Sequence, residues 1–394
     1  MINESMYAWG SEPSAIRQLF AYGLERKKAI GADKVFDFSL GNPNVPTPQV
    51  VTDTLKALLE RSPETLHGYT PAQGDSATRQ AVANEISKRF EVKASPDSVY
   101  MTVGAAASIS ISLAAVSHPG DEIIVNAPYF PEYRVWATQA GCKVVEVATK
   151  SDDFSLDTKA IADAITPKTS AIIVNSPNNP VGTVYSKQNL IELARVLEQK
   201  QKETGHPIYL ISDEPYREIV YTETVPYVPS IYARTLVCYS YSKSLSLPGE
   251  RIGYVYVSDE MDKEEHDKVF LAVCGAGRAL GYVCAPALFQ KAIAECVNVP
   301  SGVAAYAKNR KLLTEGLSAL GYEYIEPKGA FYLWVKALED DAKAFSEKAK
   351  QFELLIVPSD SFGVKGWVRI SYCVSPETIV NSMPAFEALM KAYR

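Results

Sequence analysis

Seven short apolar runs mark the first two thirds of the chain. They lie at 99–103, 122–126, 143–147, 171–175, 208–212, 236–240 and 254–257. Runs of this length, rich in valine, isoleucine and tyrosine, are typical of buried β-strands. Amphipathic stretches separate most of them, such as 187–200, where Leu190, Leu193 and Leu197 recur at helical spacing. This alternation predicts a mostly parallel sheet with helices on both faces.

The pattern changes after about residue 290. We expect a helix over 308–320 that ends at Gly321, because glycine is favoured just past the last turn of a helix. Three apolar runs follow, AFYLWV, LLIVP and WVRISY, with a charged helix at about 340–351. A last helical segment is expected to be interrupted by Pro384, because proline lacks the N–H that a helix interior requires. These features predict a smaller α+β unit.

The first 45 or so residues carry proline and glycine, as in GNPNVPTP at 41–48. We expect them to form an arm and a crossing strand that joins the small unit. The predicted fold class is therefore α/β, with a mostly parallel seven-stranded sheet between helices and a smaller α+β domain. The predicted division is 1–45 for the arm and part of the small domain, 46–290 for the large domain and 291–394 for the small C-terminal domain.

Length and composition agree with a chain of this kind. A length of 394 residues suits two or three domains, and 47% hydrophobic with 22% charged residues is the ordinary globular mixture. Disordered, collagenous and coiled-coil chains are thereby excluded. The net charge of −6 disfavours nucleic acid as a partner, because such a surface repels phosphate backbones.

The six cysteines form no CxxC pattern and share no metal-ligand spacing with the four histidines. They are typical of buried core residues in a reducing compartment, so we predict no metal site. The start of the chain is polar and acidic, unlike a signal peptide, and no apolar stretch reaches the ~18 residues that a membrane span needs. We therefore expect a soluble cytoplasmic protein without a membrane partner.

Polar or small residues directly follow four of the predicted strands, at the place where ligands bind in sheets of this kind. Gly104, Ala105 and Ala106 follow the first strand and open a helix, where backbone N–H groups can face an anion. SPNNPVG follows the fourth strand, DEPY the fifth and YSKSLSLPGER the sixth. Alone, an aspartate here is usually a helix cap and a lysine usually an exposed loop residue. Their joint occurrence predicts a site at one edge of the sheet, formed by Asn179, Asp213, Tyr216, Lys243 and Arg251.

Five ordered motifs carry a resemblance to a known family: YTPAQG at 69–74, NSPNNP at 175–180, Asp213 with Tyr216, SYSK through GERIG at 240–253, and Arg369. In these motifs the chain resembles the class I/II aminotransferases, the fold-type I pyridoxal-phosphate enzymes, and is similar to aspartate aminotransferases. The resemblance covers nearly the whole chain. It implies pyridoxal 5'-phosphate as cofactor, transfer of an amino group between an L-amino acid and a 2-oxo acid such as 2-oxoglutarate, and a homodimer with shared active sites.

The resemblance also implies a role for each residue in these motifs. Lys243 would be the Schiff-base lysine and a proton carrier, and Asp213 would pair with the ring nitrogen of the cofactor and keep it protonated. Tyr216 and Asn179 would hydrogen-bond the ring oxygen. The other cofactor contacts would be the phosphate ligands Gly104, Ala105, Ala106, Ser240, Ser242 and Arg251, the stacking aromatic Phe130 (or its neighbour Tyr129), and Tyr69 of the partner subunit.

For the substrate, the resemblance makes Arg369 the fork that holds the α-carboxylate, helped by the backbone at Gly41 and by Asn179. A dicarboxylic donor such as aspartate needs a second cation. Arg278 lies 27 residues beyond Arg251, near the position of an arginine that one branch of the family supplies from the partner subunit. The glycines around Arg278 suggest a mobile or closely packed loop, in which a solvated arginine is the alternative reading.

Two other functions remain open from the sequence. A C–S β-lyase or cyclase on the same scaffold would keep almost every residue named above. A non-catalytic pyridoxal-phosphate-binding regulator would usually add a DNA-binding module, and neither a helix-turn-helix-like extension nor a basic tract is visible at either end. A dinucleotide dehydrogenase is disfavoured, because the turn after the first strand lacks GxGxxG.

Overall fold

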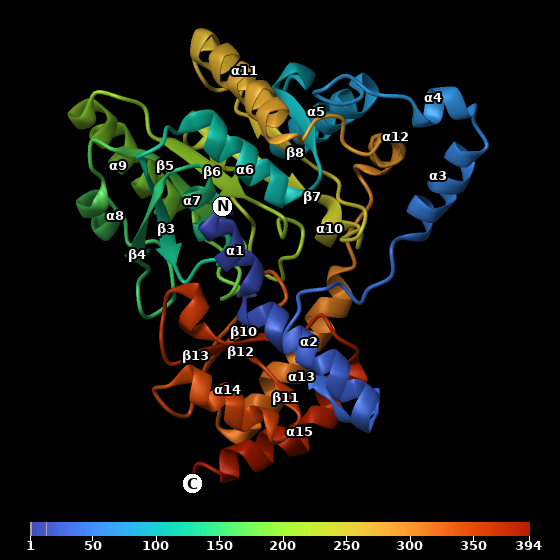
Figure 1. The fold of residues 1–394 in the computed structure, drawn as a ribbon, viewed down its shortest axis with the longest axis vertical. Helices are drawn as coiled ribbons and strands as arrows, with labels where there is room; N and C mark the ends of the chain where they lie inside the picture. Colours follow the sequence, from blue (N-terminus) through green and yellow to red (C-terminus); the bar gives the residue numbers. More distant parts are fainter. Residues whose placement is uncertain (1, 13) are drawn as a thin grey trace.

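The structure is a computed structural model that describes residues 2–12 and 14–394, with a large part around one sheet and a smaller part below it (Figure 1). Its α-helices are α1 (Glu4–Ser11), α2 (Ala15–Ile30), α3 (Gln49–Leu59), α4 (Pro63–His67), α5 (Ser76–Phe90), α6 (Ala105–Val116), α7 (Glu132–Gln139), α8 (Thr158–Ala164), α9 (Lys187–Thr204), α10 (Tyr241–Ser244), α11 (Lys263–Leu280), α12 (Ala287–Cys296), α13 (Val303–Leu320), α14 (Ala342–Lys350) and α15 (Pro376–Lys391). None of these helices is long and apolar enough to cross a membrane within the part of the chain that is described.

The strands of the large sheet confirm the seven predicted runs. They are β2 (Val99–Thr102), β3 (Glu122–Ala127), β4 (Lys143–Ala148), β5 (Thr169–Asn175), β6 (Tyr209–Asp213), β7 (Thr235–Ser240) and β8 (Gly253–Val257). Their order is β2-β8-β7-β6-β5-β3-β4, and β8 alone among them runs antiparallel to its neighbours β2 and β7. The carboxyl ends of the other six strands therefore meet at one edge.

Side chains on the central strands alternate between two helical layers, as the pleat of a strand requires. Ile172 of β5 packs in a buried cluster with Leu190 and Leu193 of α9. The next residue, Ile173, packs on the opposite face with Ile109 of α6. Because both faces are covered, the strands are apolar throughout, which is why short continuous runs identified them in the sequence.

The smaller part contains a four-stranded antiparallel sheet of order β12-β13-β10-β9 and a two-stranded parallel pair, β1-β11. These strands are β1 (Phe36–Asp37), β9 (Tyr324–Ile325), β10 (Tyr332–Lys336), β11 (Leu354–Leu355), β12 (Val357–Pro358) and β13 (Trp367–Ser371). Phe36 of β1 pairs with Leu354 of β11, so the N-terminal segment adds a strand to the smaller part. Helices α13 and α15 complete the buried core around Phe331 and Ile370.

Two local predictions in the helical regions are wrong. The last helix is continuous from Pro376 to Lys391 and is not interrupted at Pro384. The Pro384 side chain is exposed. Ile379, before it in the helix, and Phe386, after it, are both buried in the core. Packing of these two residues therefore holds both halves in one helix. The predicted helix 308–320 begins earlier, at Val303, and ends at Gly321 as expected.

The expected loop around Arg278 is also wrong, because these residues form the last turns of α11. Val273 is fully buried against the sheet and anchors this end of the helix. A Cβ atom on Gly277 would lie 2.2 Å from the hydroxyl oxygen of Tyr100, so this glycine allows the helix to approach the sheet closely.

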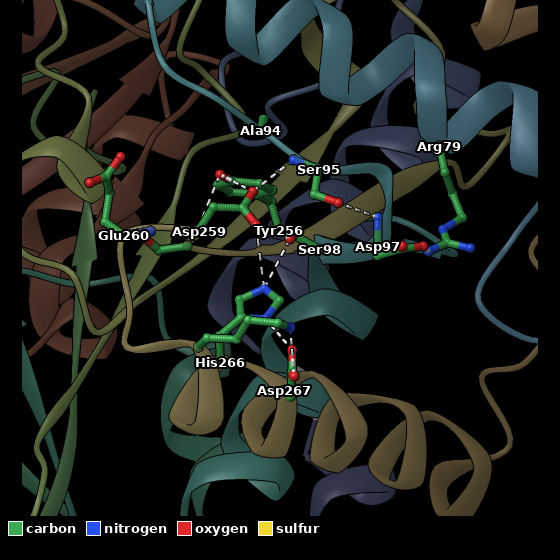
Figure 2. Close-up of polar contacts among 12 residues, drawn as sticks. Arg79, Ala94, Ser95, Asp97, Ser98, Tyr256, Asp259, Glu260, His266 and Asp267 are labelled. Atoms are coloured by element: carbon green, nitrogen blue, oxygen red, sulfur yellow. Dashed lines mark hydrogen bonds and ion pairs between the residues drawn. The ribbon is translucent and has the colours of Figure 1, made fainter.

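A polar cluster ties α11 to the β2 edge of the sheet (Figure 2). The carboxylate of Asp259 accepts hydrogen bonds from the Ser95 backbone, the Ser98 hydroxyl and the Tyr256 hydroxyl. The Ser98 oxygen also lies 2.9 Å from Nε2 of His266, at the start of α11. Ser98 is fully buried, so this cluster fastens the edge strand whose other end leads into α6 and the site.

Candidate active site

A cavity of about 470 Å³ lies at the carboxyl edge of the large sheet, bounded by both parts of the molecule. It brings together the five side chains that the sequence predicted at this edge, Asn179, Asp213, Tyr216, Lys243 and Arg251. The other predicted residues that line it are Gly41, Ala105, Ala106, Phe130, Ser240, Ser242 and Arg369. Within the described residues, no group of three His, Cys, Asp or Glu side chains is arranged to hold a metal ion.

Asp213, the last residue of β6, is the buried carboxylate of the cavity. Its Oδ2 atom accepts a hydrogen bond of 2.5 Å from the Tyr133 hydroxyl, whereas Oδ1 is buried and has no hydrogen-bond partner among the described residues. Burial raises the pKa of Asp213 to about 7, although the Tyr133 hydrogen bond opposes this shift. Burial also raises the pKa of Tyr133, which keeps its hydroxyl a donor. The free Oδ1 atom can therefore receive a cationic N–H donor.

Lys243 lies in α10, directly after β7, and its side chain crosses the cavity to the opposite wall. Its Nζ atom donates a hydrogen bond of 2.6 Å to the Gly41 carbonyl. Burial lowers the pKa of Lys243 to about 8, and the positive charges of Arg251 and Arg369 lower it further. An amine with this pKa is partly neutral near pH 7, so it can act as a nucleophile and accept a proton.

One end of the cavity is built for an anion. Helix α6 begins at Ala105 with no side chain capping its first N–H groups, which leaves these donors facing the cavity end. The hydroxyls of Ser240 and Ser242 lie 2.7 Å apart, and Arg251 Nη1 is 3.5 Å from the Ser242 hydroxyl. Gly104 does not line the cavity, but a Cβ there would lie 2.8 Å from Arg251 Nη2, so glycine makes room for the guanidinium.

Arg369 on β13 brings a guanidinium into the cavity from the smaller part of the molecule. It is 1% exposed, and it donates through Nη1 to the Asn179 side chain at 3.0 Å and through Nη2 to the Ser39 carbonyl at 2.6 Å. Its Nε atom has no partner among the described residues. The ring of Tyr332 lies under the guanidinium at 4.6 Å. A buried arginine without a paired carboxylate is prepared to bind a carboxylate ligand.

Tyr216 and Asn179 are fixed by further contacts. The Tyr216 hydroxyl lies 2.8 Å from the Tyr332 hydroxyl. The Asn175 side chain accepts a hydrogen bond of 2.7 Å from the Asn179 backbone and donates one of 2.9 Å to the Asp213 carbonyl. Asn175 thus couples the loop after β5 to the end of β6.

The structure distinguishes Phe130 from its neighbour Tyr129. Phe130 lines the cavity, whereas the Tyr129 hydroxyl donates to Glu146 on β4, and Tyr129 is buried. The Phe130 ring contacts the Trp136 ring edge-on, with centroids 6.0 Å apart. Trp136 also lines the cavity.

Besides Gly104, the predicted residues Tyr69 and Arg278 do not line the cavity. Tyr69 is 100% exposed, and Arg278 is an exposed side chain in the last turn of α11. Neither lines the cavity of its own chain.

Several residues that line the cavity or contact its side chains were missed from the sequence. Tyr133 and Trp136 follow the predicted Phe130 at intervals of three residues, and this spacing was a signal for aromatic side chains turned to the site. Tyr332, which lines the cavity, and Ser39, whose carbonyl accepts from Arg369, carried no such signal, because both are far in the sequence from the strands of the large sheet.

Comparison with known proteins gives a consistent result. The family model for aminotransferase class I and II matches residues 33–385. The aspartate/prephenate aminotransferase of Thermus thermophilus is 31% identical over 384 residues, covering 96% of both chains. A crystal structure of an aminotransferase from Eubacterium rectale is 54% identical with a TM-score of 0.97, covering 100% of this chain and 99% of that one. The Thermus thermophilus aspartate aminotransferase solved with maleate is 29% identical with a TM-score of 0.86, covering 99% of each chain.

The fold and the cavity define a pyridoxal-phosphate-dependent enzyme of fold type I. The chain belongs to the class I and II aminotransferase family and is a pyridoxal-phosphate-dependent aminotransferase. The cavity fits this cofactor: the unpartnered Oδ1 atom of Asp213 suits a protonated ring nitrogen, and the uncapped start of α6 beside Arg251 suits a phosphate. The predicted family, fold class and cofactor are confirmed.

The raised pKa of Asp213 predicts a pH dependence of stability in the cofactor-free protein. The folded chain holds the Asp213 proton up to about pH 7, whereas the unfolded chain releases it near pH 4, so this group's contribution to stability falls as pH rises between these values. Relative to Asp213→Asn, the unfolding free energy of the wild-type protein should fall by about 3–4 kcal/mol from pH 4 to pH 8.

Urea unfolding of both proteins at several pH values measures this difference. Asp163→Asn, at an exposed position in α8, is the control, for which no comparable slope is expected. If the unfolding free energy of the wild-type protein varied with pH in parallel with that of Asp213→Asn, burial would not raise the pKa of Asp213.

Proposed function

We propose that this aminotransferase takes its amino group from a dicarboxylic L-amino acid such as aspartate and gives it to a 2-oxo acid such as 2-oxoglutarate. The observation that carries the proposal is the single cavity in which Lys243, Asp213 and Arg369 meet. Relatives named aspartate aminotransferase support a dicarboxylic amino donor. The Thermus thermophilus structure supports it too, because it was solved with maleate, which is a dicarboxylate.

We assign the roles of the cofactor residues as follows. When bound, pyridoxal phosphate supplies an aldehyde that takes up the amino group and a ring that withdraws electrons from the substrate α-carbon. Lys243 is the Schiff-base lysine, and its Nζ atom takes the α-proton from the substrate and returns a proton. Through its Oδ1 atom Asp213 would accept a hydrogen bond from the ring nitrogen and keep that nitrogen protonated, with Tyr133 keeping the carboxylate oriented. Tyr216 and Asn179 donate to the ring oxygen.

The remaining residues bind and orient. The phosphate is held by the N–H groups at Ala105 and Ala106, by the hydroxyls of Ser240 and Ser242 and by Arg251, with Gly104 leaving room for that arginine. Phe130 stacks on the ring. Arg369 binds the α-carboxylate, together with Asn179 and the backbone at Gly41.

We also propose a homodimer with shared active sites. Tyr69 is fully exposed in its own chain, and a large aromatic side chain in this position is suited to enter a partner's cavity and reach the phosphate. Arg278 is likewise exposed outside its own cavity and would reach a distal carboxylate only in the partner's cavity.

The predicted division into 1–45, 46–290 and 291–394 is part of the proposal, supported by the pairing of β1 with β11. Binding at the boundary of two domains would let domain movement exclude water from the site. All six cysteines are free, which supports a reducing compartment such as the cytoplasm.

Assay of the holoenzyme with a panel of amino acids and 2-oxoglutarate tests the function. We expect aspartate to yield oxaloacetate, with glutamate formed in equal amount, and at a higher kcat/KM than alanine. Release of pyruvate and ammonia from cysteine conjugates without an oxo acid would instead identify a C–S β-lyase. Equal or better use of neutral donors would contradict the dicarboxylic proposal.

The shared-site proposal predicts two results for the holoenzyme. Sedimentation should give twice the chain mass of 43.2 kDa. Tyr69→Phe should weaken cofactor binding about tenfold or more, since a hydrogen bond to a charged phosphate is lost. Tyr22→Phe, which removes the hydroxyl of a tyrosine that is 40% exposed on α2, is the control and should leave cofactor affinity unchanged. A monomeric holoenzyme, or equal affinity in both variants, would contradict shared sites.

A further inference from the structure

One wall of the cavity has no role in the function proposed above. Ile16 and Arg17, in the first turn of α2, line it together with Glu132 and Trp136 of α7. We call these four residues the outer wall. Phe130 adjoins it from both sides, because its ring packs in one cluster with Ile16 and contacts the ring of Trp136. The outer wall therefore flanks Phe130, the residue proposed to stack on the cofactor ring.

Arg17 is the cation of the cavity that remains unassigned. The four basic side chains that line the cavity are Arg17, Lys243, Arg251 and Arg369. The last three are used by the cofactor and the α-carboxylate in the proposed function. The Arg17 side chain makes no hydrogen bond or ion pair with any residue in the ranges 2–12 and 14–394. Its charge is free for a ligand.

The position of Arg17 in its helix is electrostatically unfavourable without a ligand. A helix N-terminus carries partial positive charge, so acidic side chains are favoured in the first turn and basic ones are disfavoured. Helix α2 has no acidic residue in that turn, and the side chain of its N-cap residue, Ser14, makes no capping hydrogen bond. A carboxylate beside Arg17 would relieve both positive charges at once.

Packing holds Arg17 at the cavity. Ile16 and Leu19 are buried in one cluster with Trp334 of β10. Towards the other end of α2, Lys27 forms an ion pair of 2.7 Å with Asp37 of β1. The helix is thus fixed to the same part of the molecule that carries Arg369, and the two arginines keep their relative position.

We propose that Arg17 binds the distal carboxylate of the dicarboxylic substrate, from the same chain that binds its α-carboxylate through Arg369. The inference rests on the proposed function and replaces Arg278 in that role. Glu132 stands on the same wall, and its side chain has no hydrogen bond or ion pair with any described residue. Its negative charge opposes an acidic substrate and moderates the affinity that Arg17 provides.

Binding of succinate, a dicarboxylate that cannot react, tests Arg17 separately from turnover. Calorimetry of the holoenzyme should show a succinate Kd about 10- to 100-fold higher in Arg17→Gln, the loss expected for a charge-assisted hydrogen bond. Arg17→Lys should lie between that variant and the wild type, and Glu132→Gln should bind succinate more tightly. Lys28→Gln is the matched control, because it removes an exposed charge from the same helix away from the cavity.

Kinetics with aspartate and alanine complete the test. Arg17→Gln should lower kcat/KM for aspartate about 10- to 100-fold and leave that for alanine within about twofold. Equal loss for both donors, unchanged succinate binding, or a selective loss in Arg278→Gln instead, would overturn the proposal. If no amino acid is transaminated at all, the proposed function fails, whereas weakened succinate binding in Arg17→Gln would still support the assignment of Arg17.

Discussion

The site depends on the carboxylate of Asp213, which the fold buries with a hydrogen-bond partner for only one of its two oxygens among the described residues. Asp213 ends a central strand, and packing on both faces of the sheet removes it from water. Tyr133 satisfies one oxygen, whereas the other has no partner among the described residues. Burying a charge without a partner is costly, so the cofactor-free protein raises the pKa of this group. In the role that we propose for Asp213, a protonated pyridine nitrogen would remove that cost, so that cofactor binding and the ionisation of Asp213 would support each other.

Three basic side chains of the site, Lys243, Arg251 and Arg369, meet in the cavity at the same edge of the sheet. Burial lowers the pKa of Lys243, and the nearby charges of Arg251 and Arg369 lower it further, which prepares the amine for chemistry near neutral pH. Arg369 comes from β13 but donates to Asn179, next to β5. The arginine that we propose as the anchor for the substrate α-carboxylate therefore also joins the two parts of the molecule.

The sequence predicted the large sheet well, because strands covered on both faces must be apolar throughout. It also predicted the cavity residues that directly follow a strand, such as Asp213 and Lys243, because parallel strands end at a common edge. Tyr332 and Ser39 were missed, since their places depend on how the small sheet packs. The local predictions at Pro384 and around Gly277 were wrong, because tertiary packing keeps both residues in helices.

Arg17 illustrates the same limit of local patterns. An isolated arginine near the start of a helix has no distinguishing sequence signal, and its meaning comes from the cavity that α2 reaches by packing on β10 and β12. Arg278 has a suggestive spacing from Arg251, but its side chain lies outside the cavity of its own chain.

The central claim is that Lys243 binds the cofactor in the cavity that Asp213 and Arg369 share. Borohydride reduction of the holoenzyme, followed by peptide mapping, tests this most directly. We expect the pyridoxyl group on the peptide that contains Lys243, and we expect no labelled peptide from Lys243→Ala. A pyridoxyl group on another lysine, or a purified protein that binds no cofactor, would contradict it.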